Sequence, residues 1–425
     1  MQDNEKKPAL RFKGFTDPWE QRKLSELTSM HARIGWQNLR TSEFLDSGDY
    51  MLITGTDFDD GTVNYSTCHF VERERYEQDK NIQIRNGSIL ITKDGTLGKV
   101  AYVQGLSMPA TLNAGVFNVE IRNTSIVDER YLFQYLKAPF LMDYVDKKAT
   151  GGTIKHLNQN ILVDFPVVMP KKTEQVSIGN FFQRIDTLIT LHQRKYEKLV
   201  NIKKSMLDKM FPKNGASVPE IRFKGFTDPW EQRKLAELTK TITTGKSVNS
   251  DEGEVSDGNI GVLKTSCVSY DRFNPSESKP VVKSEQQLVK CAVEKDSVIV
   301  SRMNTPERVG ACGYVSTDFP NLFLPDRLWK LKFQDTVDTY FVYMMLVSSA
   351  YKEKITSMAS GTSGSMYNIP KETFLNLQLV IPAKIDEQKQ LGKILKKIDT
   401  LITLHQRKLE KLQNIKKSCL EKMFV

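Results

Sequence analysis

Basic, amide and aromatic side chains gather at turns and in two glycine-rich loops of this 425-residue sequence, 149–160 and 358–370. Arginine reads guanine and asparagine reads adenine in the DNA major groove, while glycine and serine loops let backbone amides approach phosphates. The alternative for each side chain is an ordinary exposed loop residue. The candidate DNA contacts are Lys93, Lys99, Lys155, His156, Arg302, Asn304, Arg308, Tyr367 and Asn368.

Motifs for catalysis, cofactor binding and metal binding are missing from the sequence. Gly245-Lys246-Ser247 is only a fragment of a phosphate-binding loop, because Lys240 stands where such a loop needs glycine. There is no G-x-G-x-x-G after a strand, no G-x-S-x-G and no H-E-x-x-H. The five cysteines never form C-x-x-C, and the five histidines share no ligand spacing. We expect no catalytic residues, no metal site and no cofactor bound by this chain.

The charge is basic overall but not at the predicted contacts. Lys and Arg number 61 against 51 Asp and Glu, a net charge of +10 that suits nucleic acid or an acidic membrane surface. Residues 28–172 carry net −1 and residues 239–385 carry net +1, so the surplus lies mainly on two long helical segments. Either those helices follow DNA phosphates or their lysines form a solvated face. The polar N-terminus and the lack of a long apolar run predict a cytoplasmic protein that does not span a membrane.

The sequence contains the same frame twice. Residues 11–27 return at 222–238 with 16 of 17 positions identical, and residues 185–211 return at 398–424 with 23 of 27 identical. Between these segments identity collapses while the order of apolar runs is kept. Near-identical frames around dissimilar inserts predict two units with one topology and different surfaces.

The shorter repeated segment has the features of a helix start. Asp17 can cap, Pro18 suits the first helical position, and Glu20 completes a capping box. Asp228, Pro229 and Glu231 repeat the pattern.

The longer repeated segment predicts helices over 173–211 and 386–424, which lack internal proline. Apolar residues at spacings of three and four form a narrow seam, and helices of this length rarely stand alone. The two seams are therefore expected to pair as an antiparallel coiled coil with approximate two-fold symmetry. His192 and His405 lie on the seam, as packed or register-setting residues or, alternatively, as metal-binding or catalytic groups. The seam residues are Ile185, Ile189, His192, Tyr196, Leu199, Ile202, Ile398, Ile402, His405, Leu409, Leu412 and Ile415.

Each insert has the pattern of a mixed α/β domain. The first predicts a strand at 50–58, two strands at 88–103 around an Asp-Gly turn, a strand at 115–121 and a helix at 128–148 interrupted near Pro139. The predicted segments are a first target-recognition domain at 1–172, a spacer helix at 173–211, a linker and second domain at 212–385, and a second helix at 386–425.

The duplicated F-x-G-F-x-D-x-W-E-Q-R-K-L, the dissimilar inserts and the helices entered through Glu174-Gln175 and Glu387-Gln388 resemble the specificity subunits of Type I restriction–modification systems. The resemblance covers essentially the whole chain. It implies a non-catalytic subunit whose two domains each read half of a bipartite, asymmetric site on double-stranded DNA. The family has no general base-contact motif to transfer, so the contact residues rest on residue type and position alone.

The resemblance also implies partners. Two copies of a methyltransferase subunit and a motor-endonuclease subunit would join the chain, and S-adenosylmethionine, ATP and Mg would be bound by those partners. Two alternatives stay open: a stand-alone DNA-binding regulator or nuclease component, and a coiled-coil interaction scaffold that does not bind DNA.

Overall fold

The computed structural model describes residues 7–148, 156–212, 216–256, 258–270, 272–361 and 366–424. The chain divides into two units. Unit 1 comprises Met1–Gln193 with Arg407–Val425, and unit 2 comprises Arg194–Gln406. Each long helix is therefore divided between the units, in contrast to the predicted segments, which treat the helices separately. None of the helices in the described ranges is long and apolar enough to cross a membrane.

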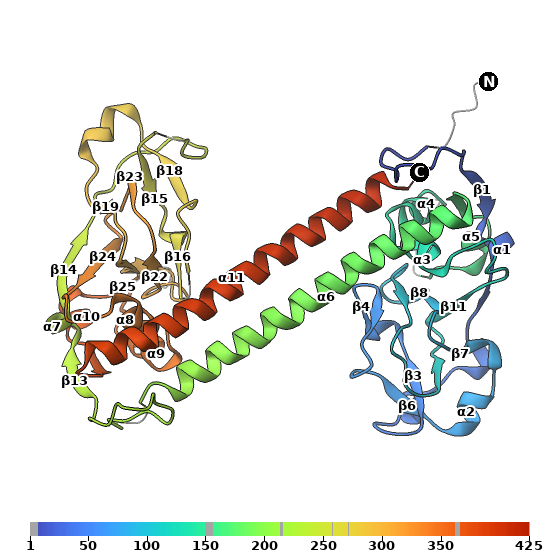
Figure 1. Ribbon diagram of the computed structural model, residues 1–425, viewed down its shortest axis with the longest axis horizontal. Coiled ribbons are helices and arrows are strands. Elements are labelled where there is room, and N and C mark those ends of the chain that lie inside the picture. Colours follow the sequence, from blue (N-terminus) through green and yellow to red (C-terminus); the bar gives the residue numbers. More distant parts are fainter. Residues whose placement is uncertain are drawn as a thin grey trace. The chain divides into compact units, whose positions relative to one another are not determined.

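Unit 1 is built on two four-stranded sheets (Figure 1). The inner sheet is antiparallel and orders β2 (Thr28–His31), β11 (Val116–Ile121), β8 (Ile89–Thr92) and β9 (Val100–Tyr102). The outer sheet orders β6 (His69–Val71), β3 (Tyr50–Ile53), β10 (Ala110–Leu112) and β7 (Gln83–Ile84), with β10 parallel to β3. Leu90 of β8 packs between the sheets, whereas its neighbours Ile89 and Ile91 pack on the opposite face. Strand β8 is therefore buried on both faces.

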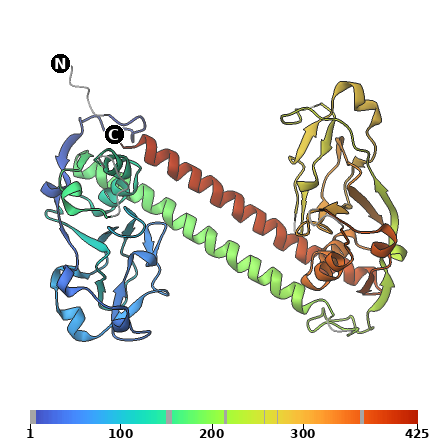
Figure 2. The same ribbon diagram turned by 180° about the vertical axis from the view of Figure 1, so that it is seen from behind.

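Helices cover the free face of the inner sheet. They are α3 (Glu129–Lys137), α4 (Phe140–Lys148), α5 (Gln159–Val163) and the first part of α6 (Lys172–Lys209). The view from behind shows the same arrangement (Figure 2). The predicted strands within 88–103 and 115–121 and the interruption of the helix at Pro139 are confirmed, and so is the mixed α/β fold class. The strand predicted over 50–58 ends at Ile53, because a 3₁₀ turn over Gly55–Asp57 separates β3 from the next short strand.

Unit 2 repeats this order with different side chains. One sheet orders β14 (Thr239–Thr244), β24 (Leu328–Phe333), β20 (Ser297–Ser301) and β22 (Cys312–Val315). The other orders β18 (Ser278–Pro280), β15 (Gly261–Leu263), β23 (Phe319–Phe323) and β19 (Ala292–Val293). Helices α8 (Thr339–Leu346), α9 (Ser349–Ser357) and α10 (Lys371–Leu375) precede α11 (Ile385–Lys422). The two long helices agree with prediction to within two residues at each end.

The predicted helix start in the short repeated segment is wrong. Glu20–Lys23 is strand β1, paired antiparallel with β12 (Pro166–Met169), and Glu231–Lys234 is strand β13, paired with β26 (Gln378–Ile381). Only a single turn of helix follows, α1 (Leu24–Leu27) or α7 (Leu235–Leu238). The strand partner supplies the backbone hydrogen bonds that a helix would have made locally, so tertiary pairing overrides the capping pattern.

In each unit, the short repeated segment binds the first turn of the long helix through an arginine–glutamate pair. Arg11 donates two hydrogen bonds of 2.7 Å to the buried carboxylate of Glu174, in the first turn of α6. Arg222 forms the same bidentate pair with Glu387 of α11, at 2.7 and 2.8 Å. The carboxylate raises the pKa of each guanidinium, chiefly through these hydrogen bonds. Two charge-assisted bonds with fixed geometry anchor each unit to the helix that leaves it.

A glutamine and a glycine complete each joint. Gln175 accepts a 2.8 Å hydrogen bond from the backbone N–H of Asp128, the residue that caps α3. Gly179 lies beneath the same cap: a Cβ there would be 2.9 Å from Asp128 Oδ1 and 3.0 Å from the Tyr131 nitrogen. In unit 2, Gln388 accepts from the N–H of Asp338, and Gly392 lies under the Asp338 carboxylate.

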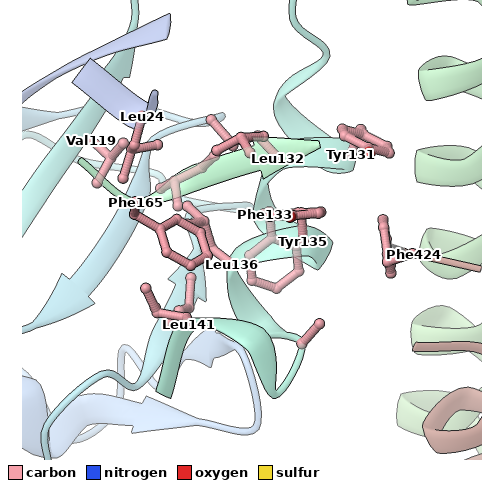
Figure 3. Packing of buried hydrophobic residues seen from close by; sticks show 14 of the residues in the cluster. Leu24, Val119, Tyr131, Leu132, Phe133, Tyr135, Leu136, Leu141, Phe165 and Phe424 are labelled. Carbon is pink, nitrogen blue, oxygen red and sulfur yellow. The ribbon is translucent and has the colours of Figure 1, made fainter. Parts of the chain in front are cut away.

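Each long helix ends in the core of the unit that it does not start from. Phe424, after α11, stacks on Phe182 of α6 and packs against Tyr131 and Tyr135 of α3 (Figure 3). Phe211, after α6, stacks on Phe341 of α8 and meets Trp230 edge to face. Within unit 1, Phe182 contacts Phe424 and Asp186 contacts Lys416, so these parts of α6 and α11 run antiparallel.

The seam follows the predicted spacing except at one position in each helix. Ile202 and Ile415 are 38% and 39% exposed. Lys203 and Lys416, one residue later, lie inside and complete an unbroken alternation of four and three residues from Ile185 to Met210 and from Ile398 to Met423. The isoleucines were predicted on the seam because they are apolar, but the helical repeat places the following lysine on the face that contacts the other helix. The other predicted seam residues, including His192 and His405, are buried or half-buried.

We expect Gly179→Ala to destabilise the protein. Helix propensity alone would favour alanine by about 1 kcal/mol. Because the added Cβ meets the backbone and the capping carboxylate of α3, we expect a net loss of about 1–3 kcal/mol in the free energy of unfolding. Urea or thermal unfolding measures it. The control is Gly35→Ala, whose Cβ has no atom within 4 Å. A Gly179→Ala protein as stable as this control contradicts the joint as described.

Candidate nucleic-acid interface

The β8–β9 hairpin of unit 1 is joined to the later part of the first glycine-rich loop. The Leu157 N–H donates to the Lys93 carbonyl at 2.8 Å, and the His156 ring nitrogen Nδ1 lies 2.5 Å from Asp94 Oδ1. Gly95 and Gly98 have positive φ angles of 73° and 70°, which glycine adopts without strain and which let the hairpin turn tightly. Lys93, Lys99 and His156 therefore belong to one surface, while Lys155 lies outside the described residues.

Unit 2 repeats this junction as a short ladder. Strand β21 (Met303–Asn304) pairs antiparallel with β25 (Tyr367–Asn368), and the Ile369 N–H donates to the Arg302 carbonyl at 2.9 Å. Residues more than 60 positions apart thus meet where the second glycine-rich loop ends. The ladder brings together four of the predicted contact residues of unit 2, Arg302, Asn304, Tyr367 and Asn368.

Three predicted contacts are accessible to a ligand. The side chains of Lys99 and Arg308 are exposed, and no ion pair involving either is found in the described part of the chain. The His156 side chain is 71% exposed and is paired with Asp94. These residues remain the strongest candidates for contacting DNA.

Three other predicted contacts are engaged inside the protein. The Lys93 ammonium lies over the Phe117 ring, 5.5 Å from its centroid. Arg302 donates from Nε to the Asp326 carbonyl at 2.8 Å and lies over Trp329. Asn304 is buried, donates to Ser301 Oγ at 3.0 Å and accepts from the Thr305 N–H at 2.9 Å. These contacts hold the hairpins in shape and leave little of Asn304 for a base.

Tyr367 and Asn368 occupy an intermediate position. Tyr367 is half-buried against the core of unit 2. Asn368 is half-buried too, and its Oδ1 atom has no hydrogen-bond partner among the residues that the structure describes. A side-chain carbonyl in that state retains its capacity to accept a hydrogen bond.

A cavity next to Lys99 was not anticipated from the sequence. It has a volume of about 270 Å³, and its lining includes Lys99, Lys137 and Asp60. Asp60 stands in the turn between β4 (Phe58–Asp59) and β5 (Thr62–Val63), with a positive φ of 40°. Lys137 donates to its carboxylate at 2.7 Å. The signal for this hairpin in the sequence is its Asp59-Asp60-Gly61 turn.

The two charges of this cavity have shifted pKa values. Burial lowers the pKa of the Lys137 ammonium, assisted by the nearby charge of Lys416. Burial alone would raise the pKa of the Asp60 carboxyl, but the charge and the hydrogen bond of Lys137, together with the charge of Lys416, hold that pKa below its ordinary value. The cavity therefore holds an ion pair between the largely buried Lys137 and the exposed Asp60, beside the exposed Lys99.

The corresponding hairpin of unit 2 carries different chemistry. Tyr270 follows β16 (Val268–Ser269), and its hydroxyl donates to the Val309 carbonyl at 2.7 Å. The Lys352 ammonium lies 4.1 Å from the centre of the Tyr270 ring. An aspartate–lysine pair at one hairpin is thus replaced by a tyrosine–lysine contact at the other.

The described residues contain no group of three or more His, Cys, Asp or Glu side chains placed to hold a metal ion. The cysteines are free, and burial raises the pKa of the Cys68 thiol to about 12. A thiol that stays protonated at neutral pH is a poor nucleophile.

Comparisons with known proteins agree with this architecture. Relatives include the Type I restriction enzyme MjaVIII specificity subunit of Methanocaldococcus jannaschii, 25% identical over 345 residues, which covers 80% of this chain and 78% of the relative. The putative type I restriction enzyme MjaX specificity subunit of the same organism is 24% identical over 413 residues, covering 94% and 91%. The crystal structure of a Type I restriction–modification S subunit from M. genitalium superposes with a TM-score of 0.68 at 16% identity, covering 99% of both chains. Its fold is the fold of this chain.

The family model described as the Type I restriction modification DNA specificity domain matches residues 16–201 and again 227–414. Those two ranges span both inserts and most of both long helices. The chain therefore belongs to the family of Type I restriction–modification DNA specificity proteins, with two copies of the specificity domain.

Proposed function

We propose that this chain is the non-catalytic subunit that selects a bipartite, asymmetric DNA site for a methyltransferase and a restriction subunit. The observation that carries the proposal is the contrast between joints and loops. The Arg–Glu joints are the same in both units, whereas Asp60 pairs with Lys137 in unit 1 and its counterpart Tyr270 lies against Lys352 in unit 2.

The contrast favours two half-sites of different sequence. A protein with two identical reading surfaces favours a palindrome. Here unit 1 offers Lys99, His156 and the Asp60–Lys137 pair, while unit 2 offers Arg308, Tyr367 and Asn368. Donors and acceptors of different kinds select different base edges.

The duplicated frame favours two equivalent docking surfaces for a protein partner. Leu188 and Leu191 of α6 are 43% and 44% exposed, and Leu404, the counterpart of Leu191 in α11, is 44% exposed. Apolar side chains exposed at repeated positions are typical of an interaction surface. We propose that two methyltransferase subunits bind there and that a motor-endonuclease subunit joins the complex, in the cytoplasm. S-adenosylmethionine, ATP and Mg would be bound by those partners.

The central test is co-production with the methyltransferase encoded beside this chain, followed by mapping of methylated bases. Two short sequences at a fixed separation are expected. A stand-alone regulator or nuclease component would instead bind its site without a partner. A coiled-coil scaffold would give no sequence-specific binding even with the methyltransferase supplied, and that result refutes the proposal.

We expect Arg308→Ala to weaken recognition of the half-site read by unit 2. Loss of a base contact costs about 1–3 kcal/mol at one position, whereas loss of a phosphate contact weakens binding to all sequences alike. Fluorescence anisotropy with duplexes altered in one half-site distinguishes the two. Lys283→Ala, at an exposed lysine of the 3₁₀ segment Lys283–Leu288, is the matched control. Affinity equal to that of the control removes Arg308 from the interface.

Replacing residues 28–172 with the insert of another family member should change one half-site only. The joints at Arg11–Glu174 and Arg222–Glu387 are retained in such a chimera, so the second unit keeps its surface. Methylation mapping gives the result directly. A change in both half-sites would show that the units do not read DNA independently.

A further inference from the structure

A lysine occupies the same seam position in both long helices. The side chains of Lys203 and Lys416 are only 15% and 8% exposed. Half-buried Leu199 and Met206 flank Lys203 on the seam, and Leu412 and Cys419 flank Lys416. A charged group in a seam that is otherwise mostly apolar is costly to bury unless it is paired.

Each lysine is paired with an aspartate of the other helix. Lys416 lies 2.5 Å from Asp186 in unit 1, and Lys203 lies 2.7 Å from Asp399 in unit 2. Asp186 and Asp399 are equivalent positions of the repeat, and so are Lys203 and Lys416. The two ion pairs are therefore reciprocal: each helix contributes the aspartate of one pair and the lysine of the other.

The aspartates also bind the recognition part of each unit. Gln134 of α3 donates to Asp186 Oδ2 at 2.9 Å, and the Tyr340 hydroxyl of α8 donates to Asp399 Oδ2 at 2.5 Å. Each carboxylate thus contacts two helices besides its own. Asp186 of α6 binds α11 and α3, and Asp399 of α11 binds α6 and α8. A change of register between α6 and α11 would separate the lysine from an aspartate that is held in place by a third element.

Displacement of α6 along α11 by one heptad would move the two helices relative to each other by about 10 Å. That distance corresponds to about three base pairs of B-DNA. The hydrophobic positions would repeat after this displacement, because the seam is periodic. Each lysine would then lie opposite an uncharged residue seven positions from its aspartate, and each aspartate would lose its lysine. Those residues are Gln193 and Gln406, or Gly179 and Gly392. A single polar residue in an apolar seam specifies register in this way, at a cost in stability.

We infer that the pairs Asp186–Lys416 and Asp399–Lys203 are specificity determinants that set the register of α6 on α11 and, through it, the number of base pairs accepted between the half-sites. The inference rests on the proposed function. It assigns the spacer length to four named side chains of the seam, in addition to the length of the helices.

The test replaces the charges without leaving a buried charge unpaired. Asp186→Asn with Lys416→Met keeps the oxygen that accepts from Gln134 and fills the seam with an apolar chain. Adding Asp399→Asn and Lys203→Met treats unit 2 in the same way. The matched control, Lys417→Met with Glu421→Gln, removes one lysine and one acid from exposed positions of the same helix.

Each full-length variant is assembled with the methyltransferase subunit and assayed on duplexes that share both half-sites. The spacers run from three base pairs shorter to three base pairs longer than that of the parent site. The readout is the ratio of methylation rates at the parent spacer and at each altered spacer, together with the thermal midpoint of the complex.

The expected result separates specificity from stability. The rate ratio falls about tenfold in the four-substitution variant and less in the two-substitution variant, while the control keeps the parent ratio. Thermal midpoints stay the same or rise, because apolar replacement of a buried ion pair is often neutral or stabilising. An unchanged ratio in the folded variant overturns the inference, and so does a ratio that falls only in step with a falling midpoint. A parent complex that methylates one uninterrupted sequence refutes the proposed function itself.

Discussion

The architecture depends on one contact that occurs in both units. An arginine near the start of each repeat forms a bidentate pair with a buried glutamate in the first turn of a long helix. Arg11–Glu174 and Arg222–Glu387 tie strands β1 and β13 to the helices that leave their units. Around them, Gln175, Gln388 and the two glycines fit the capped ends of α3 and α8 against the same turn. Because the arginine, glutamate, glutamine and glycine of this joint each contact a defined partner, the repeated segments tolerate little change in sequence. The loops outside the joint do not have this constraint.

Polar contacts in this protein therefore occur in three settings, each with a different role. At the joints they are bidentate and buried, and they hold each domain on its helix. Along the seam they are isolated among apolar residues, where their value lies in excluding wrong alignments. At the hairpins they are partly exposed, and the two units differ: Asp60 meets Lys137, whereas Tyr270 meets Lys352. Because the joints are common to both units and the hairpin contacts differ, recognition is assigned to the hairpins.

Local patterns were sufficient for the regular elements but not for positions decided by distant partners. The strands within 88–103 and 115–121 and both long helices followed from periodicity, because burial of one face repeats at a regular interval. Glu20–Lys23 was misjudged as a helix start because its strand partner lies some 140 residues away. Lys203 and Lys416 were passed over because only the opposite helix supplies their aspartates. Arg302 and Asn304 were chosen by residue type, and each also donates to a carbonyl far away in the sequence, that of Asp326 and that of Thr265.

The place of Phe424 in the core of unit 1 bears on the order in which the chain folds during synthesis. Unit 2 is a single stretch, 194–406, and all of its core residues are synthesised before the last turns of α11 are made. Unit 1 contains most of the N-terminal half, yet its core also includes Cys419, Leu420, Met423 and Phe424. The first domain to be translated is therefore the last to be completed, and until then Phe182 and Tyr131 lack the aromatic ring that covers them.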